Sequence, residues 1–261
     1  MTAAQSPVLL HRQGSVSVLT LNRPAAMNAL DVPTAEAFLA ACHEIENDGI
    51  TRAVILRGAG RCFGVGGDLA ALRDGGPELA AGLIEAMHSG IRILGAMNAP
   101  VIASLHGAVA GGSLSLALAC DMAIAAEGAK FNMAYANVGA SCDVSGSWSL
   151  PRLVGLRKAL EIALLCDSFD ATKALELGLV NRVVPAAHLE GETLLLAQRL
   201  ADGPTLAYGR IKRLMRQSFD TPFAEQLDAE RDEFQASTQT QDFNQAMSAF
   251  FAKRPPVFSG R

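Results

Sequence analysis

Apolar side chains dominate residues 100–121, and glycines at positions 107, 111 and 112 divide this stretch. The run at residues 101–105 predicts a buried strand, and the small residues at 113–119 predict a helix. The first N–H groups of a helix have no partner within it and carry partial positive charge. The strand, loop and helix are therefore consistent with an oxyanion site, and equally with tight packing alone.

The same order of strand, glycine-rich loop and helix occurs earlier, at residues 53–72. Five glycines lie between residues 58 and 67, directly before a short helical pattern at 69–72. Two such units side by side would direct two backbone N–H groups at one oxygen atom. We therefore expect the two glycine-rich loops to be neighbours in the fold.

Strands and helices alternate over the first two hundred residues, and the pattern then becomes mainly helical. Further strands are expected at residues 16–21, 122–125 and 180–184, and further helices at 31–47, 78–97, 171–177 and 189–202. This order predicts an α/β fold. Because Gly203 and Pro204 interrupt the pattern, we expect a core at residues 1–203 and a helical region at residues 204–261. The basic run at 210–216 favours a solvated helix face.

Composition narrows the class of protein. Half of the 261 residues are hydrophobic, 18% are charged and the net charge is −4, which argues against a disordered chain and against a nucleic-acid binder. The polar residues within 100–121 disfavour a membrane span, and residues 1–14 do not resemble a signal peptide. The five cysteines form no CxxC pair, which favours free thiols in the cytoplasm and no metal site.

Two side chains outside the glycine-rich loops are candidates for chemistry. Residues 137–147 form a predicted loop of small residues in which Asp143 is the one carboxylate. A loop carboxylate is commonly solvated or caps a helix, so this position alone does not assign a role. His88 adjoins the apolar face of the helix expected at 78–97, where a partly buried structural histidine is the favoured interpretation.

Several short motifs follow one another at specific spacings: Leu21-Asn22-Arg23-Pro24, Asn28-Ala29-Leu30, Phe63-Gly64-Val65-Gly66-Gly67-Asp68, and Pro100-Val101-Ile102-Ala103 before Gly107 and Gly111-Gly112. In order and spacing they resemble the crotonase (enoyl-CoA hydratase/isomerase) superfamily, across essentially the whole chain. Residues 130–155 look closest to the Δ3,Δ2-enoyl-CoA isomerases and ring-1,2-epoxyphenylacetyl-CoA isomerases.

The resemblance implies a crotonase-like spiral of ββα units with a C-terminal α-helical region for trimerisation, assembled as a homotrimer or a homohexamer built as a dimer of trimers. It implies an acyl-CoA thioester substrate and no cofactor beyond that coenzyme A. The thioester oxygen would lie between the N–H groups of Gly67 and Gly112. The residues implied to bind coenzyme A are Arg23, Ala25, Gly64, Gly66 and Asp68, together with Phe250 and Lys253 of the tail, which a neighbouring subunit could supply.

The variable positions of the family set the chemistry. Hydratases that this chain resembles carry two glutamates, where it has Ser115 and Tyr135. Neither side chain replaces a carboxylate that must activate water. Asp143 falls where the similar isomerases place their acid/base, and one carboxylate is sufficient to move a proton between two carbons. We therefore expect an isomerase, with Val138, Val144 and Trp148 enclosing Asp143.

Three alternatives remain open from the sequence. The 4-chlorobenzoyl-CoA dehalogenases of this superfamily use an aspartate nucleophile, a histidine base and a tryptophan, whose positions correspond to Asp143, His88 and Tyr135. The tyrosine lacks the indole N–H that would orient the carboxylate. The other two alternatives are a hydratase of low efficiency and a non-catalytic acyl-CoA binder.

Overall fold

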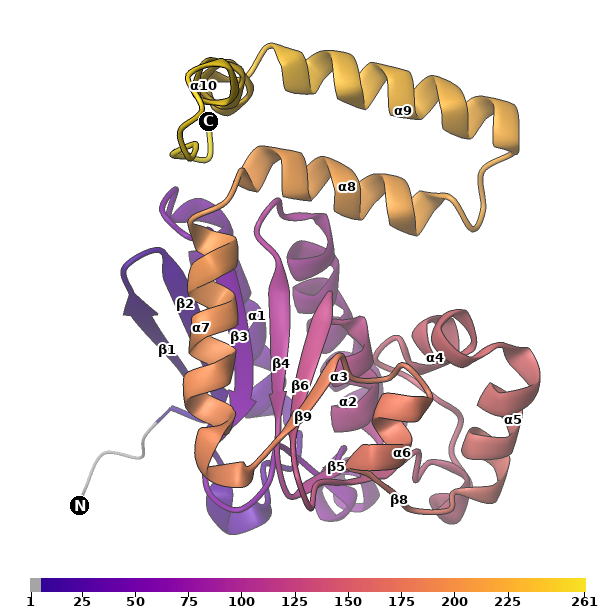
Figure 1. Ribbon diagram of the computed structural model, residues 1–261. Coiled ribbons are helices and arrows are strands. Elements are labelled where there is room, and N and C mark those ends of the chain that lie inside the picture. Colours follow the sequence, from indigo (N-terminus) through magenta and orange to yellow (C-terminus); the bar gives the residue numbers. More distant parts are fainter. Residues whose placement is uncertain (1–5) are drawn as a thin grey trace.

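A six-stranded sheet forms the centre of the protein, whose computed structural model describes residues 6–261 (Figure 1). The strands in spatial order are β1 (Val8–Gln13), β2 (Val16–Leu21), β3 (Ala53–Gly58), β4 (Val101–Leu105), β6 (Met122–Ala126) and β9 (Arg182–Val184). The first two strands form an antiparallel hairpin, and every later neighbour in the sheet is parallel. The α/β fold class expected from the sequence is confirmed.

A smaller sheet lies below the first and is made of β5 (Ala108–Ala110), β7 (Lys130–Asn132) and β8 (Phe169–Asp170). The sequence did not predict these strands, because each has only two or three residues and finds its partner far along the chain. β5 lies inside the second glycine-rich loop. It also forms a bridge to the first such loop, through Gly64 and Val109.

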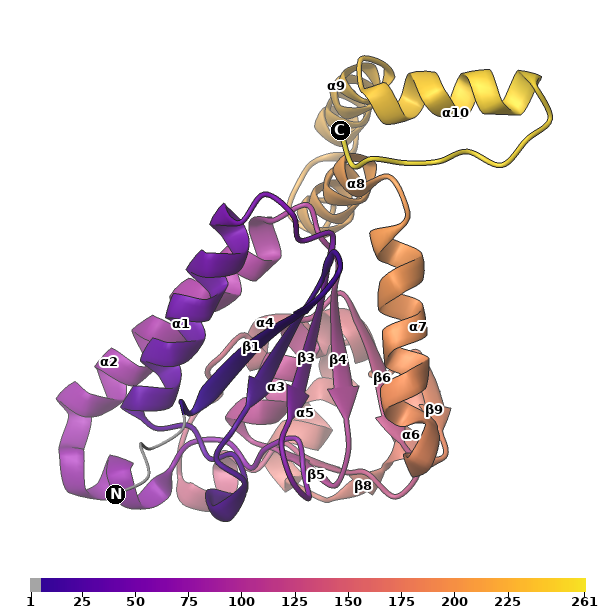
Figure 2. The same cartoon turned by 90° about the vertical axis from the view of Figure 1, so that its left-hand side faces the viewer.

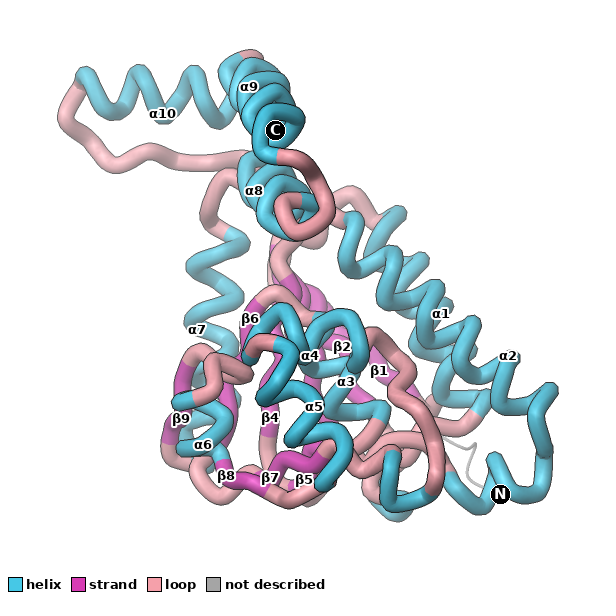
Figure 3. The backbone as a smooth tube through the Cα atoms, turned by 90° about the vertical axis from the view of Figure 1, so that its right-hand side faces the viewer, coloured by secondary structure: helices cyan, strands magenta, loops and turns pink. Residues whose placement is uncertain are grey.

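Helices cover both faces of the six-stranded sheet. Figure 2 shows α1 (Val32–Asn47) and α2 (Leu69–Ala96) on one side and α7 (Leu189–Ala201) on the other. The helices expected at 69–72 and 78–97 are joined in α2, which is interrupted at Gly76, with φ of 68°, and continues at Pro77. The remaining short helices are α4 (Gly146–Val154), α5 (Leu156–Leu165), α6 (Ala171–Glu176), η1 (Pro24–Ala26), η2 (Ala136–Val138) and η3 (Ala186–His188), with α4 and α5 side by side (Figure 3).

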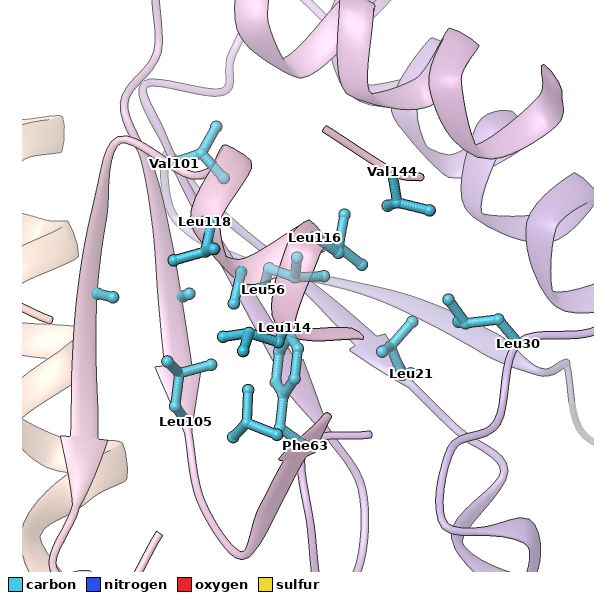
Figure 4. Packing of buried hydrophobic residues seen from close by; sticks show 14 of the residues in the cluster. Leu21, Leu30, Leu56, Phe63, Val101, Leu105, Leu114, Leu116, Leu118 and Val144 are labelled. Carbon is cyan, nitrogen blue, oxygen red and sulfur yellow. The ribbon is translucent and has the colours of Figure 1, made fainter. Parts of the chain in front are cut away.

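The main hydrophobic core lies between the sheet and α1, α2 and α3 (Gly112–Ala119) (Figure 4). Leu56, Phe63 and Leu114 are fully or almost fully buried there. Burial of side chains of this size contributes about 1.5–3 kcal/mol each. Residues 112–118 of α3 are buried on every side, which explains why its sequence shows no polar face. This burial fixes the start of α3 in the centre of the molecule.

The helices α8 (Thr205–Gln217), α9 (Phe223–Thr238) and α10 (Gln241–Phe251) extend beyond one end of the sheet (Figures 1 and 2). The expectation of a solvated basic face on α8 is wrong. Lys212 and Arg216 each lie 2.8 Å from a carboxylate oxygen of Asp121, and only 12% of that side chain is exposed. Burial lowers the pKa of the Lys212 ammonium, and the charge of Asp121 opposes that shift. The basic run therefore anchors α8 to the core.

The division into residues 1–203 and 204–261 stays a prediction. α7 ends at Ala201 and α8 begins at Thr205, but the ion pairs with Asp121 join the two regions. Over residues 6–261, no helix has both the length and the apolar character required to cross a membrane.

Candidate active site

A cavity of about 720 Å³ lies where the two glycine-rich loops meet. Its walls come from η1, the loop at 65–68, both segments of α2, the start of α3 and the loop at 134–144. Leu72, Leu83 and Ile84 form an apolar wall on α2. Ile84 belongs to the apolar face of the helix expected at 78–97, and nothing in an apolar pattern separates a residue that lines a cavity from one that fills a core. These lining residues were therefore missed.

Gly67 and Gly112, whose N–H groups the resemblance assigns to the thioester oxygen, both line this cavity, and that role stays a prediction. Gly67 follows the bend at Gly66, and Gly112 is the first residue of α3. Across residues 6–261, neither backbone N–H donates a hydrogen bond. A Cβ at Gly66 would lie 2.9 Å from the nitrogen of Gly112, so glycine at 66 allows the two loops to touch.

Asp143 lies beside Gly112 and is bonded to Tyr135. A Cβ at Gly112 would lie 3.6 Å from Oδ1 of Asp143. The Tyr135 hydroxyl donates to that same oxygen at 2.5 Å, and Ser115 Oγ lies 2.9 Å from the Tyr135 oxygen. Because the Tyr135 proton is directed at the carboxylate, Ser115 is the donor in the second bond. The three side chains form a chain of hydrogen bonds that ends on the carboxylate.

Tyr135 remains protonated in this arrangement. Burial, and then the negative charge of Asp143, raise the pKa of the Tyr135 hydroxyl above its ordinary value. Tyr135 is therefore a hydrogen-bond donor to Asp143 and a poor candidate for a base.

The expected apolar enclosure of Asp143 is wrong for one of its three residues. Val144 is buried and Val138, although 52% exposed, lines the same cavity as Asp143, whereas Trp148 is 43% exposed and lies outside the lining in the described part of the chain. The Trp148 ring is instead covered by the Arg152 guanidinium, 4.2 Å from the ring centroid. Helix α4 begins directly after the loop and turns Trp148 outward, an outcome that depends on tertiary packing.

His88 lies on α2, half-buried, and does not line the cavity in the described part of the chain. Its Nε2 atom accepts the backbone N–H of Val144 at 3.2 Å. His88 therefore contacts the turn that carries Asp143 and does not face the space in front of the carboxylate.

Asp68 lines the cavity, and its carboxylate already accepts a hydrogen bond and forms an ion pair within the protein. It caps α2 by accepting the N–H of Ala71, and it lies 3.2 Å from Nη1 of Arg23. These two interactions, the N–H of Ala71 first, hold the pKa of Asp68 below its usual value. Arg23 also pairs with Asp31 at 3.1 Å and does not line the cavity. Arg23 thus joins η1 to the segment before α1 and to the start of α2.

The other residues implied to bind coenzyme A lie outside the cavity lining within residues 6–261. Gly64 packs against Ser113, and Gly66 donates its N–H to Ser113 Oγ at 3.0 Å, so both glycines shape the loop. Ala25 is exposed on η1, next to lining residues 26 and 27. Phe250 and Lys253 are exposed at the end of α10 and after it. Their contacts with coenzyme A, including contacts from a neighbouring subunit, stay predictions.

Among the described residues, no group of three or more His, Cys, Asp or Glu side chains is placed to hold a metal ion.

A family model described as Enoyl-CoA hydratase/isomerase matches residues 11–261. The chain belongs to this family. It is 36% identical over 259 residues to a 1,2-epoxyphenylacetyl-CoA isomerase of Escherichia coli (strain K12), covering 97% of this chain and 98% of that one. It is 32% identical over 254 residues to a short-chain-enoyl-CoA hydratase of Clostridium acetobutylicum, covering 95% of each.

Solved structures of this enoyl-CoA hydratase/isomerase family have the same fold. The crystal structure of an enoyl-CoA hydratase from Polaromonas sp. JS666 superimposes with a TM-score of 0.91 at 35% identity, over 97% of this chain and 99% of that one. The crotonase-like fold predicted from the sequence motifs is confirmed. The relatives include both hydratases and isomerases, so membership makes the protein an acyl-CoA enzyme of this family and leaves the reaction open.

Proposed function

We propose that the protein is an enoyl-CoA isomerase that shifts a double bond between the Δ3 and Δ2 positions, or carries out a related ring isomerisation, with Asp143 as its acid/base. One observation carries the proposal. Within residues 6–261, the carboxylates that line the cavity are Asp68 and Asp143, and Asp68 is engaged by the start of α2 and by Arg23. Asp143 is the carboxylate left to exchange a proton with a substrate.

The reaction uses Asp143 twice. The thioester oxygen accepts the N–H groups of Gly67 and Gly112, which have no other partner in the described chain. Asp143 removes the proton at C2, the electron pair moves onto the thioester oxygen as a dienolate, and Asp143 returns the proton at C4. The double bond moves from C3=C4 to C2=C3, and the carboxylate is regenerated. Coenzyme A enters only as part of the substrate.

The side chains beside Asp143 argue against an efficient hydratase. Adding water across a double bond needs a second group that activates the water. Ser115 is fully buried and does not line the cavity within the described residues, and Tyr135 donates its proton to Asp143. Neither is placed to act as that second group.

The placement of His88 argues against a dehalogenase. A histidine base must reach a water molecule in front of the substrate, and its acceptor nitrogen must be free. The Nε2 atom of His88 accepts the Val144 N–H, and the side chain does not line the cavity within residues 6–261. The structure therefore favours the isomerase over this alternative.

The cavity also indicates the class of acyl group. Its lining is mainly apolar, and no Lys or Arg lines it in the described chain. A charged acyl group would lose its hydration there without gaining a partner. We infer an uncharged, apolar acyl group, either an alkenyl chain or a ring.

Exposed aromatic residues support assembly into a homotrimer or homohexamer. Phe223, Phe234, Phe250 and Phe251 on α9 and α10 are each 66–80% exposed. Large exposed apolar side chains on neighbouring helices are a feature of surfaces that pack against another subunit. Light scattering after size-exclusion chromatography would give three or six subunits; a monomer would contradict the inferred assembly.

The function is tested with a panel of 3-enoyl-CoA, 2-enoyl-CoA and 4-chlorobenzoyl-CoA thioesters. We expect interconversion of the two enoyl esters, and loss of 10²-fold or more of kcat in Asp143→Asn, because an amide cannot carry the proton. The matched control is Asp202→Asn, at the exposed end of α7 on the opposite face of the sheet. Full activity of Asp143→Asn, halide release, or binding without turnover would each refute the proposal.

A further inference from the structure

The turn that carries Asp143 has an unusual backbone. Val144 and Ser145, the next two residues, have φ values of 51° and 74°, in the left-handed region. This region is unfavourable for residues other than glycine, and most of all for a β-branched residue such as valine. Such a conformation persists only where surrounding contacts hold it.

Three sets of contacts hold this turn. The Val144 side chain is 1% exposed and lies in the main core with Leu116 and Leu30 (Figure 4). Ser145 Oγ donates to the carbonyl oxygen of Ser115 at 3.2 Å. The Val144 N–H donates to Nε2 of His88 at 3.2 Å, which joins the turn to α2.

The direction of that last bond defines the state of the imidazole. A peptide N–H can only donate, so Nε2 of His88 is the acceptor and carries no proton. The ring is then neutral, with its proton on Nδ1. His88 in this state fixes the direction of the peptide group that follows Asp143 and is not available as a base.

We propose that His88 is a positioning residue for Asp143. Tyr135 holds the carboxylate group itself, and His88 holds the peptide bond directly after it. Together these two contacts keep the carboxylate beside Gly112 while a proton moves from C2 to C4. The inference rests on the proposed role of Asp143.

The hydrogen bond between His88 and Val144 also links the Asp143 turn to the part of α2 that lines the cavity. Ile84 precedes His88 by one helical turn, so the two side chains lie on the same face of the helix. Ile84 lines the cavity, and His88 contacts the Asp143 turn. The same segment of α2 thus lines the cavity proposed for the acyl group and contacts the turn that carries Asp143.

The test compares His88→Gln with His88→Leu, measuring kcat and KM separately. In His88→Gln the amide oxygen takes the place of Nε2 and can accept the Val144 N–H; in His88→Leu nothing can. We expect His88→Leu to lose about 10- to 100-fold in kcat with KM little changed, because a small misplacement of a reacting group has an effect of this size. His88→Gln should keep most of the activity. His43→Gln, at an exposed histidine of α1, is the matched control.

The results for the His88 variants test positioning, and the result for Asp143→Asn tests the proposed function. Equal loss in His88→Gln and His88→Leu, with His43→Gln active, would overturn positioning and indicate a base. Full activity of His88→Leu would also overturn it. If His88→Leu does not fold, His88→Asn replaces it, because the shorter amide cannot reach Val144, and the same comparison applies. If Asp143→Asn is active, the proposed function has failed, whatever the His88 variants show.

Discussion

The hydroxyl oxygen of Tyr135 lies 2.5 Å from Oδ1 of Asp143, and Tyr135 receives a hydrogen bond from Ser115 in turn. This bond holds Asp143, the carboxylate of the cavity lining that has no ion-pair partner among residues 6–261, next to Gly112. Ser115 and Tyr135, which the resemblance places at the glutamate positions of hydratases, therefore form a hydrogen-bonded chain that ends on Asp143.

Removing the Tyr135 hydroxyl should slow the reaction without abolishing it. A hydrogen bond to a charged group contributes about 1.5–3 kcal/mol, so we expect Tyr135→Phe to lose roughly 10- to 100-fold in kcat. KM should change little, because the lost bond orients the acid/base rather than the substrate. The control is Tyr208→Phe on α8, which does not line the cavity. An unchanged kcat in Tyr135→Phe would show that the bond has no role in the reaction.

Ser115→Glu should not turn the protein into a hydratase. Ser115 is fully buried, and a Cβ at Gly146 would overlap its Oγ atom, so the site has no space for a longer side chain. Overpacking of this kind costs about 1–3 kcal/mol, and a buried carboxylate adds to that cost. We expect a lower midpoint of thermal unfolding than in Ser115→Ala, and no hydration of a 2-enoyl-CoA. Efficient hydration by a stable Ser115→Glu protein would refute this reading of the site.

Asp121→Asn should destabilise the attachment of the C-terminal helices. It leaves Lys212, with 9% of its side chain exposed, and Arg216 without their carboxylate partner. Breaking a buried ion pair costs about 3 kcal/mol, which urea unfolding would detect. The exposed pair of Arg231 and Asp228 provides the control, since Asp228→Asn should cost less than about 1 kcal/mol. Equal effects of the two variants would contradict a buried anchor.

Asp68 makes stability depend on pH in the acid range. Its pKa is lowered in the folded protein, so its charged form stabilises the fold. This contribution is fully present above the unfolded pKa of about 3.9 and is lost as the pH falls through the lower, folded value. The difference in free energy of unfolding between the parent protein and Asp68→Asn should therefore be constant at neutral pH and shrink below about pH 4. A difference that grows on acidification would contradict this sign.

The pattern of apolar residues and glycines was sufficient to predict the longer strands and the loops that follow them. The strands at 53–58 and 101–105, and the glycine-rich loops after them, were predictable because apolar runs and glycines act over a few residues. The strands β5, β7 and β8 were not, because short strands exist only through distant partners. The basic face of α8 was misjudged for the same reason, since its partner Asp121 lies far away in the sequence.

The sequence likewise identified some residues of the candidate site and missed others. The resemblance assigned Gly67, Gly112 and Asp143 to one reaction, and all three line the same cavity, while their roles stay predictions. Of the apolar shell predicted around Asp143, Val138 and Val144 line the cavity, but Trp148 does not, because α4 turns it outward. The contact from His88 to Val144 has no sequence signal, since it joins residues 56 positions apart through a backbone atom.

The close approach of Gly66 to Gly112 means that mutations of the glycine-rich loops and mutations of the side chains around Asp143 have different effects. The spacing of the two N–H groups at 67 and 112 depends on main-chain atoms of residues 66 and 112, and not on the side chains of Tyr135 or Asp143. A descendant of this chain could exchange either of these two side chains and still polarise a thioester, whereas a longer side chain at position 115 would also need space beside Gly146. The loops can thus be inherited while residues that act on the proton change, which is consistent with hydratases and isomerases sharing one scaffold.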